Sequence, residues 1–186
     1  MKKAKVRERI YLSLDELNQM EIDILNRRHV ERYAMIRQWC YGNVLDISCG
    51  SGYGTHLISK NPDVNKITGM DIDEGAIEWA NNHFANNKCL FKQRSIEKVN
   101  QNFNCLVCIE TIEHLKNPQI VNDLCDRCNI QTIFISYPSK KTTHYNKYHY
   151  HDFNDSDIIK IFQNYSLQDT IDLHREVRIL KFKRNV

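Results

Sequence analysis

The 186-residue sequence predicts an α/β fold, in which a mostly parallel sheet of seven strands has helices on both faces and an antiparallel hairpin at its C-terminal end. Strand-like and helix-like segments alternate at the spacing of right-handed β-α-β units. The last two strand-like segments follow one another too closely for a crossover helix, which favours a hairpin. The length suits one compact domain, and we expect residues 1–186 to form it.

The N-terminal part of the chain is expected to be helical. Residues 13–28 begin with Ser13 and carry Glu16 three residues later, which is the pattern of a capping box. Apolar residues then recur at helical spacing. A second helix is expected over residues 29–40. Residues 1–40 are therefore predicted to be a helical element that precedes a core at residues 41–186.

The core is predicted from the period of its apolar residues. Parallel strands are expected at residues 43–48, 66–72, 89–94, 105–110 and 132–138. Helices are expected at residues 54–60, 74–84, 117–128 and 155–165. The terminal hairpin is expected at residues 167–174 and 176–184. Because ligands collect beyond the carboxyl ends of parallel strands, the loops that follow the strands should carry the functional site.

Composition narrows the functional classes. The sequence is 41% hydrophobic and 26% charged, which is ordinary for a globular protein. It has no apolar run of about 18 residues and no apolar signal-peptide centre, so we expect a cytoplasmic protein without membrane contact. The net charge of +3 comes largely from the two ends of the chain, at residues 2–9 and 181–186. Such ends are typical of solvated tails and do not indicate a nucleic-acid partner.

The seven cysteines are expected to be reduced thiols. Four of them have the spacing of a zinc ribbon, namely Cys105, Cys108, Cys125 and Cys128. The first pair falls in a predicted strand, where residues three apart point to opposite faces, and the second pair falls in a predicted helix. We therefore interpret these cysteines as small apolar core residues.

A glycine-rich loop follows the first predicted strand. Gly50, Gly52 and Gly54 allow a sharp turn and a close approach of the backbone to a ligand. Asp71 ends the second strand, where a carboxylate can bind both hydroxyls of a ribose. The glycine spacing does not match the G-x-G-x-x-G pattern of dinucleotide sites, which disfavours a nicotinamide-dependent dehydrogenase.

Three segments carry a family resemblance: "VLDISCGSGYGT", "GMDIDEGAIEWA" and "FNCLVCIETIEHL". In order and spacing they resemble the motifs of class I S-adenosylmethionine-dependent methyltransferases, which have a Rossmann-like fold. The resemblance spans about residues 29–163 and looks closest to the branch that methylates sugars and other small molecules. It implies in-line transfer of a methyl group from S-adenosylmethionine to a hydroxyl or amine of a small molecule, in particular a sugar or glycan precursor. No metal is expected, and a homodimer stays open.

The resemblance also implies roles for individual residues. The cofactor-binding set is Asp46, Ser48, Gly50, Gly52, Asp71, Ile72, Ser95, Ile96, Ile109 and Glu110. Ser48 departs from the family pattern, which has a glycine there, and Ser95 stands where the family usually offers an aspartate to the adenine. The substrate-binding set is Arg28, His29, Arg32, Tyr33, Tyr145 and Tyr148. The first four would form a lid over the cofactor, the alternative being a solvent-facing helix.

A hydroxyl acceptor would need a base, and a neutral histidine suits that role near pH 7. His114 follows the fourth strand, and His149 and His151 follow the fifth, so all three border the predicted site. Together with Glu113 they are the expected catalytic residues. The alternative is that these histidines only hold the loops in place by hydrogen bonds.

Two other functions remain open. Glu110, Glu113 and His114 form an E-x-x-E-H pattern that His149 could complete as a metal site. That set resembles the metal site of the small-RNA 3′-terminal 2′-O-methyltransferases, although the chain offers few clustered basic residues for RNA beyond Lys140, Lys141 and Lys147. The departures at Ser48 and Ser95 also allow a non-catalytic S-adenosylmethionine-binding protein.

Overall fold

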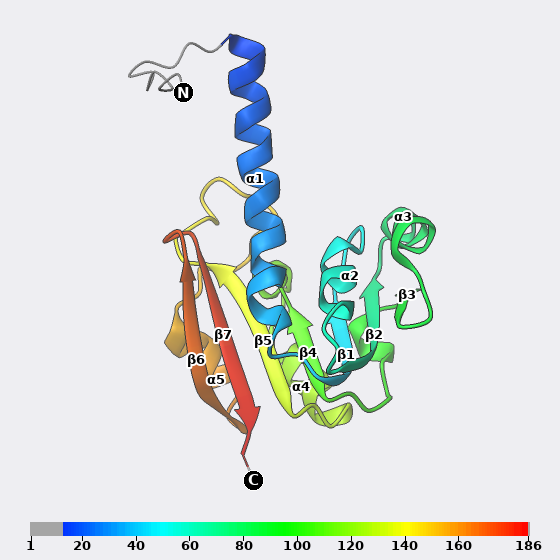
Figure 1. Cartoon of the computed structure of the whole chain (residues 1–186). Coiled ribbons are helices and arrows are strands. Elements are labelled where there is room, and N and C mark those ends of the chain that lie inside the picture. The colour runs from blue at the N-terminus through cyan, green and yellow to red at the C-terminus, as the bar shows by residue number, and fades with distance from the viewer. Residues whose placement is uncertain (1–12, 186) are drawn as a thin grey trace, which may run out of the picture.

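The computed structural model describes residues 13–185, which form a seven-stranded sheet with helices packed against both faces (Figure 1). The strands are β1 (Gly42–Ile47), β2 (Val64–Asp71), β3 (Cys89–Gln93), β4 (Cys105–Cys108), β5 (Thr132–Pro138), β6 (Tyr165–Leu173) and β7 (Val177–Arg184). The helices are α1 (Leu14–Arg37), α2 (Tyr53–Ser59), α3 (Glu74–Phe84), α4 (Gln119–Arg127) and α5 (Asp155–Ile161), with short 3₁₀ turns η1 (Ile96–Lys98) and η2 (Ile112–His114).

The strand order is β3-β2-β1-β4-β5-β7-β6. Strands β1 to β5 pair in parallel, whereas β7 is antiparallel to both β5 and β6. This arrangement confirms the predicted fold class, including the terminal hairpin. Within residues 13–185, no helix has both the length and the apolar character that crossing a membrane requires.

The N-terminal helical element differs from the prediction in one respect. The capping box is confirmed, because the Ser13 hydroxyl accepts from the Glu16 amide at 3.3 Å and the Glu16 carboxylate accepts from the Ser13 amide at 2.9 Å. The two helices expected at residues 13–28 and 29–40 are instead one continuous helix, α1. No glycine or proline interrupts this stretch, so nothing in it breaks the backbone hydrogen-bond ladder. The basic residues 2–9 lie outside the described part of the chain.

Each face of the sheet has its own apolar core. Helices α1, α2 and α3 cover one face, and α4 and α5 cover the other. Strand β4 contributes to both cores: Cys105 belongs to the core under α1, α2 and α3, and Cys108 belongs to the core under α4 and α5. All seven cysteines are buried free thiols. The opposite orientations of Cys105 and Cys108 confirm that this pair cannot converge on one metal ion, as the strand geometry predicted.

The topology fixes the position of the functional loops. Strand β1 lies between β2 and β4. From β1 the chain adds β2 and β3 on one side, and it then returns to add β4 and β5 on the other side. Because β1 to β5 are parallel, the loops that follow them all emerge at the same edge of the sheet. The widest divergence between loops in such a sheet falls outside the carboxyl ends of β1 and β4.

Candidate active site

The loop between β1 and α2 turns on three residues with positive φ: Ser48 at 54°, Gly50 at 53° and Gly52 at 86°. This region of backbone space favours glycine, and a side chain in it costs roughly 1–2 kcal/mol. Ser48 therefore adopts a backbone conformation that favours glycine, and it stands at a position where the family pattern has a glycine. Such strain outside glycine is typical of functional loops that the surrounding structure holds in place.

The three glycines of this loop have different roles. A Cβ on Gly50 would meet nothing within 4 Å, so its backbone faces open space that a ligand can enter. A Cβ on Gly52 would lie 2.7 Å from both Ala80 and the Phe91 ring, and one on Gly54 would lie 2.3 Å from the Tyr33 ring. Packing against neighbouring side chains therefore already requires glycine at positions 52 and 54, whereas the backbone at Gly50 has open space beside it. The approach of a ligand to all three stays a prediction.

Asp71, at the end of β2, ties the glycine loop to the next strand. Its carboxylate accepts from the Gly50 amide at 2.9 Å and from the Asp73 amide at 3.0 Å. A carboxylate has about four acceptor positions, so these two bonds leave capacity for further donors such as ribose hydroxyls. Asp71 is partly exposed and lines the cavity beside the loop, which is compatible with the predicted role.

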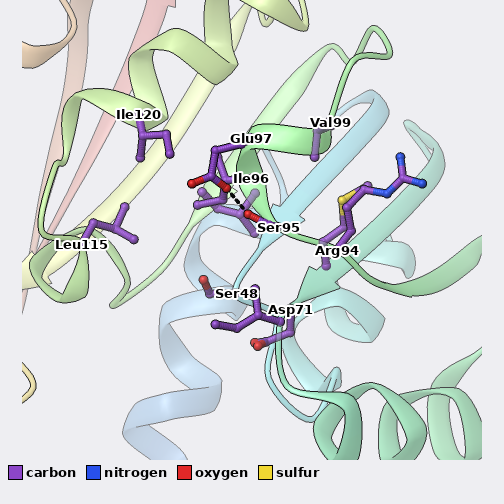
Figure 2. Close-up of a pocket in the computed structure, with 12 residues that line it drawn as sticks. Ser48, Asp71, Arg94, Ser95, Ile96, Glu97, Val99, Leu115 and Ile120 are labelled. Carbon is purple, nitrogen blue, oxygen red and sulfur yellow. Dashed lines mark hydrogen bonds between the residues drawn. The ribbon is translucent and has the colours of Figure 1, made fainter.

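That cavity has a volume of about 210 Å³ and lies between the loops after β1, β2 and β3 and the segment after β4 (Figure 2). It brings together five of the predicted cofactor residues: Ser48, Asp71, Ile72, Ser95 and Ile96. Aliphatic side chains form most of its wall, which suits a flat ring system. The sequence did not predict the other lining residues, which are Ile47, Met70, Arg94, Glu97, Val99, Leu115 and Ile120.

Asp46 lies in β1 behind the glycine loop and is fully buried. Its Oδ2 accepts from the Thr55 hydroxyl at 2.6 Å, while Oδ1 has no hydrogen-bond partner among the described residues. Burial raises the pKa of Asp46 to about 7, and the negative charge of Asp71 adds to the rise. A buried carboxylate oxygen without a donor would be satisfied by a ligand that carries a positive charge or an N–H group.

Substitution Asp46→Asn should stabilise the unliganded protein in a pH-dependent way. The folded state holds the Asp46 proton up to about pH 7, whereas the unfolded chain releases it near 3.8. The free energy of unfolding of the wild type should therefore fall as pH rises through this window, by on the order of a few kcal/mol from this group. We expect the Tm of Asp46→Asn to exceed that of the wild type by an amount that grows from pH 4 to pH 7 and then levels off. Parallel Tm curves for the two proteins would contradict the assignment.

Glu110 follows β4 and adopts a positive φ of 49°. Its backbone amide donates to the Ser136 hydroxyl at 2.9 Å, and this hydroxyl donates to the Glu110 carboxylate at 2.7 Å. The Arg32 guanidinium from α1 lies 3.6 Å from the same carboxylate. Glu110 therefore links α1, β4 and β5 at the edge of the sheet.

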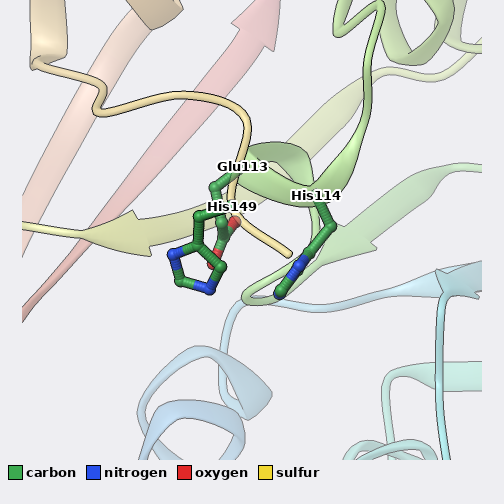
Figure 3. A group of neighbouring side chains, drawn as sticks. All are labelled: Glu113, His114 and His149. Carbon is green, nitrogen blue, oxygen red and sulfur yellow. The ribbon is translucent and has the colours of Figure 1, made fainter. Parts of the chain in front are cut away.

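Glu113, His114 and His149 form the second feature of the site (Figure 3). One potential ligand atom from each lies within 4.8 Å of the other two, and the rings of His114 and His149 meet edge to face with centroids 4.4 Å apart. Glu113 is 1% exposed, and neither of its carboxylate oxygens has a hydrogen-bond partner within residues 13–185. Burial raises the pKa of Glu113 to about 8, with a further rise from the charge of Glu110.

The loop between β5 and α5 brings His149 to this group. The Tyr150 amide donates to the Glu113 carbonyl at 2.8 Å, and His114 Nδ1 lies 3.0 Å from the Tyr148 carbonyl. Asp152 closes the base of the loop by accepting from the Thr142 amide at 2.7 Å and the Thr143 hydroxyl at 2.6 Å. The loop is thereby fastened onto η2.

Two other predicted residues are held by contacts outside this group. His151 Nε2 donates to the Leu115 carbonyl at 3.0 Å, and its ring stacks on Phe153, so it holds the loop in place. Glu110, which the E-x-x-E-H pattern placed with Glu113, is engaged by Ser136 and Arg32. Tyr145 and Tyr148 are 70% and 63% exposed and remain available to an acceptor.

The predicted lid residues lie on the last turns of α1. Arg28 forms an ion pair of 2.6 Å with Glu176, and Arg32 donates to His29 Nδ1 at 2.8 Å. Tyr33 is buried under the glycine loop with its ring against Gly54. Tyr33 thus supports the loop from below, whereas Arg28, His29 and Arg32 stay near the surface of the helix.

Comparisons with known proteins agree with this geometry. A family model described as a methyltransferase domain matches residues 12–171. Ubiquinone biosynthesis O-methyltransferase of Coxiella burnetii is 32% identical over 82 residues, which cover 41% of this chain and 34% of that protein. The chain therefore spans about a third of the length of the curated relative that it matches.

Two solved structures share the fold and contain the cofactor product. Magnesium protoporphyrin IX methyltransferase from Synechocystis PCC 6803 with bound SAH has a TM-score of 0.74 at 15% identity, covering 95% of this chain and 90% of that one. N-methyltransferase NodS from Bradyrhizobium japonicum WM9, in complex with S-adenosyl-L-homocysteine, has a TM-score of 0.71 at 14% identity, covering 94% of both chains. Both of these proteins hold S-adenosyl-L-homocysteine, the product of the cofactor that the sequence resemblance implies for this chain. Because the family model extends over most of its length, this chain belongs to the methyltransferase domain family.

Proposed function

We propose that this methyltransferase domain transfers a methyl group from S-adenosylmethionine to a hydroxyl, or an amine, of a small molecule, in particular a sugar or glycan precursor. The observation that carries the proposal is the meeting of His114 and His149, from two different loops, at the sheet edge that carries the glycine loop. Two proton-accepting side chains at this position suit an acceptor that must lose a proton as it is methylated.

The residues present fit the cofactor. Asp46 offers a buried carboxylate oxygen to a cationic amino group, Gly50 offers open backbone, and Asp71 has spare acceptor positions for hydroxyls. Ser48, Ile72, Ser95 and Ile96 line the cavity that would take the ring. Gly52, Ile109 and Glu110 are not among the residues that line this cavity, and we propose them as further cofactor contacts from the sequence resemblance alone. When bound, the cofactor supplies a methyl group that its sulfonium already activates. The contribution of the chain is then to hold the acceptor in line, an effect worth up to about 7–11 kcal/mol.

His149 is the favoured base. Partial burial and the charge of His114 lower the pKa of His149, so its ring stays neutral and can accept a proton near pH 7. His114 Nδ1 must donate to the Tyr148 carbonyl, because a carbonyl only accepts, and this leaves Nε2 as the ring nitrogen that a ligand can reach. Arg28, His29, Arg32, Tyr145 and Tyr148 are proposed to orient the acceptor.

The proposal is tested by incubating the chain with methyl-labelled S-adenosylmethionine and a panel of acceptors. The panel contains nucleotide sugars, glycans, small amines and short RNAs, each with and without EDTA. Label on a hydroxylated small molecule in the presence of EDTA would support the proposal. Label confined to RNA would overturn the acceptor class while leaving the cofactor in place.

One observation favours a second function, which is metal-dependent 2′-O-methylation at the 3′ terminus of RNA. Carboxylate oxygens and imidazole nitrogens are suitable ligands for Mg²⁺, Mn²⁺ or Zn²⁺. Glu113, His114 and His149 bring such atoms within 4.8 Å of one another, and the Glu113 oxygens lack other partners in the described part of the chain. These three residues therefore fit a divalent ion, which would supply a Lewis acid able to bind two neighbouring hydroxyls.

The two functions differ in their response to metal. In the metal-dependent case, EDTA should abolish transfer, Mn²⁺ or Mg²⁺ should restore it, and Glu113→Ala should lose both metal binding and activity. Glu78→Ala, which removes a carboxylate from the exposed surface of α3, is the matched control. Transfer that is unaffected by EDTA and by added metal would rule out this second function.

A further inference from the structure

The N-terminal part of α1 projects beyond the other elements of the structure (Figure 1). All residues from 13 to 27 are exposed. Further along the helix, Arg28 forms an ion pair of 2.6 Å with Glu176 and ties α1 to the terminal hairpin. Residues 14–27, which we call the projecting segment, therefore present an uncovered helix surface within the described part of the chain.

The projecting segment carries an apolar stripe. Its members are 50–71% exposed, and at 3.6 residues per turn they fall within about 140° of the helix circumference: Leu14, Leu17, Met20, Ile24 and Leu25. Contiguous apolar surface of this kind marks an interaction site. A helical segment of about 12–15 residues without tertiary packing is also marginal in water, so burial of the stripe would stabilise it.

We propose that the projecting segment is a homodimer interface, in which two copies of α1 pack antiparallel along their apolar stripes. A twofold pair of this kind is closed, and it covers the same surface on both copies. The interface lies outside the candidate active site, so the proposal is independent of the cofactor and of the methyl acceptor.

The charges of the projecting segment favour a second copy as the occupant of the stripe. Residues 13–26 contain four carboxylates and no Lys or Arg, and Arg27 follows at the end of the segment. Glu16 and Arg27 are separated by about three helical turns, so both lie on one flank of the stripe. In an antiparallel pair, Glu16 of each copy lies beside Arg27 of the other. In a parallel pair, the carboxylates of the two copies would instead lie beside one another.

The same charges disfavour a lipid surface. Helices that lie on anionic membranes carry Lys and Arg on their polar face, whereas the polar face of the projecting segment is mostly acidic. Its carboxylates would repel the lipid headgroups. A second copy of the chain satisfies the apolar stripe and the charges together.

The length of the segment sets the strength of the pair. Fourteen residues span roughly 21 Å of helix, so the interface lies at the lower end of the size range of specific protein interfaces. Glu21 falls within the arc of the stripe, and a single polar residue in a helix seam lowers stability. We therefore expect a dissociation constant in the micromolar range.

The test is sedimentation velocity of the full chain between about 1 and 200 μM, a range that brackets micromolar dissociation constants. The wild type should change from monomer to dimer as its concentration rises. Leu17→Glu and Ile24→Glu should each raise the dissociation constant by about tenfold or more, because each would bury an unpaired carboxylate in the stripe. Asn26→Glu adds the same charge on the opposite side of the helix from Ile24 and should leave the dissociation constant unchanged. Circular dichroism checks that each variant is folded.

A charge variant tests the antiparallel arrangement. Arg27→Glu should raise the dissociation constant several-fold, because it sets a second carboxylate beside Glu16 of the other copy. Lys160→Glu, which makes the same charge change on the exposed surface of α5, should have no effect. An equally small effect of Arg27→Glu would overturn the antiparallel arrangement.

Three results would overturn the interface itself. The first is a wild type that stays monomeric at ~200 μM, well above a micromolar dissociation constant. The second is a Leu17→Glu variant that dimerises as tightly as the wild type, which would place the contact elsewhere on the chain. The third is a monomer that cosediments with vesicles of phosphatidylglycerol and phosphatidylcholine, which would identify lipid as the occupant of the stripe.

Discussion

Substitution His149→Ala is expected to lower kcat by about 10²–10⁴-fold, the usual contribution of a general base, with little change in the affinity for S-adenosylmethionine. The reason is that partial burial lowers the pKa of His149, so its ring is neutral and able to accept a proton at working pH. Activity is measured by methyl transfer to the acceptor that the labelled panel identifies, and cofactor affinity is measured by calorimetry.

Two further variants separate this role from loop support. His149 Nδ1 lies 2.6 Å from the Thr142 hydroxyl, and His149→Asn keeps a polar group near that position while removing the second ring nitrogen. If His149 acts as the base, His149→Asn should be as inactive as His149→Ala. His144→Ala, an exposed histidine of the same loop, should retain activity. Recovery of activity in His149→Asn would show that the residue only holds the loop.

Substitution Gly54→Ala is expected to give the largest loss of stability. The added Cβ would lie 2.3–2.5 Å from three atoms of the Tyr33 ring, and this ring is buried and packed edge to face on Tyr53 at 5.6 Å. Relief of the clash would require α1 to move away from the glycine loop. We expect the free energy of unfolding to fall by about 3 kcal/mol or more, at the upper end of overpacking effects. Chemical denaturation measures this change.

The matched control is Gly75→Ala, in the exposed first turn of α3. The nearest atom to its added Cβ, the Asp73 Oδ1, is 3.4 Å away, so the substitution should leave stability unchanged or raise it slightly. If Gly54→Ala unfolded at the same denaturant concentration as the wild type, this result would contradict the close packing of the Tyr33 ring of α1 against Gly54.

Most of the fold could be predicted because its signals are local. The segment at residues 132–138 was expected as a strand and is β5, and residues 74–84 were expected as a helix and are α3. Apolar periodicity fixes such elements without knowledge of their neighbours. The prediction of two helices in residues 13–40 was wrong, because the residues there contain no signal that distinguishes one long helix from two short ones.

The site was predicted less completely, because its details depend on contacts between residues far apart in the sequence. Gly54 suggested a ligand-facing turn, yet the side chain that requires it is Tyr33, 21 positions earlier. The pattern placed Glu110 with Glu113, but the group of possible metal ligands contains only Glu113, His114 and His149, and the Glu110 carboxylate accepts from the Ser136 hydroxyl of β5. Glu97 gave no sequence signal, since an exposed glutamate after a strand is common until its hydrogen bond with Ser95 is seen.

The central claim, that the edge formed by the glycine loop and Asp71 holds S-adenosylmethionine, is tested most directly by calorimetric titration of the full chain with S-adenosylmethionine and S-adenosylhomocysteine. We predict saturable binding of both ligands at one site, with affinity reduced at least tenfold in Asp71→Ala, about the effect of losing one charge-assisted hydrogen bond. Absence of binding of both ligands at ~1 mM, a concentration that detects even affinities near −4 kcal/mol, would contradict the claim.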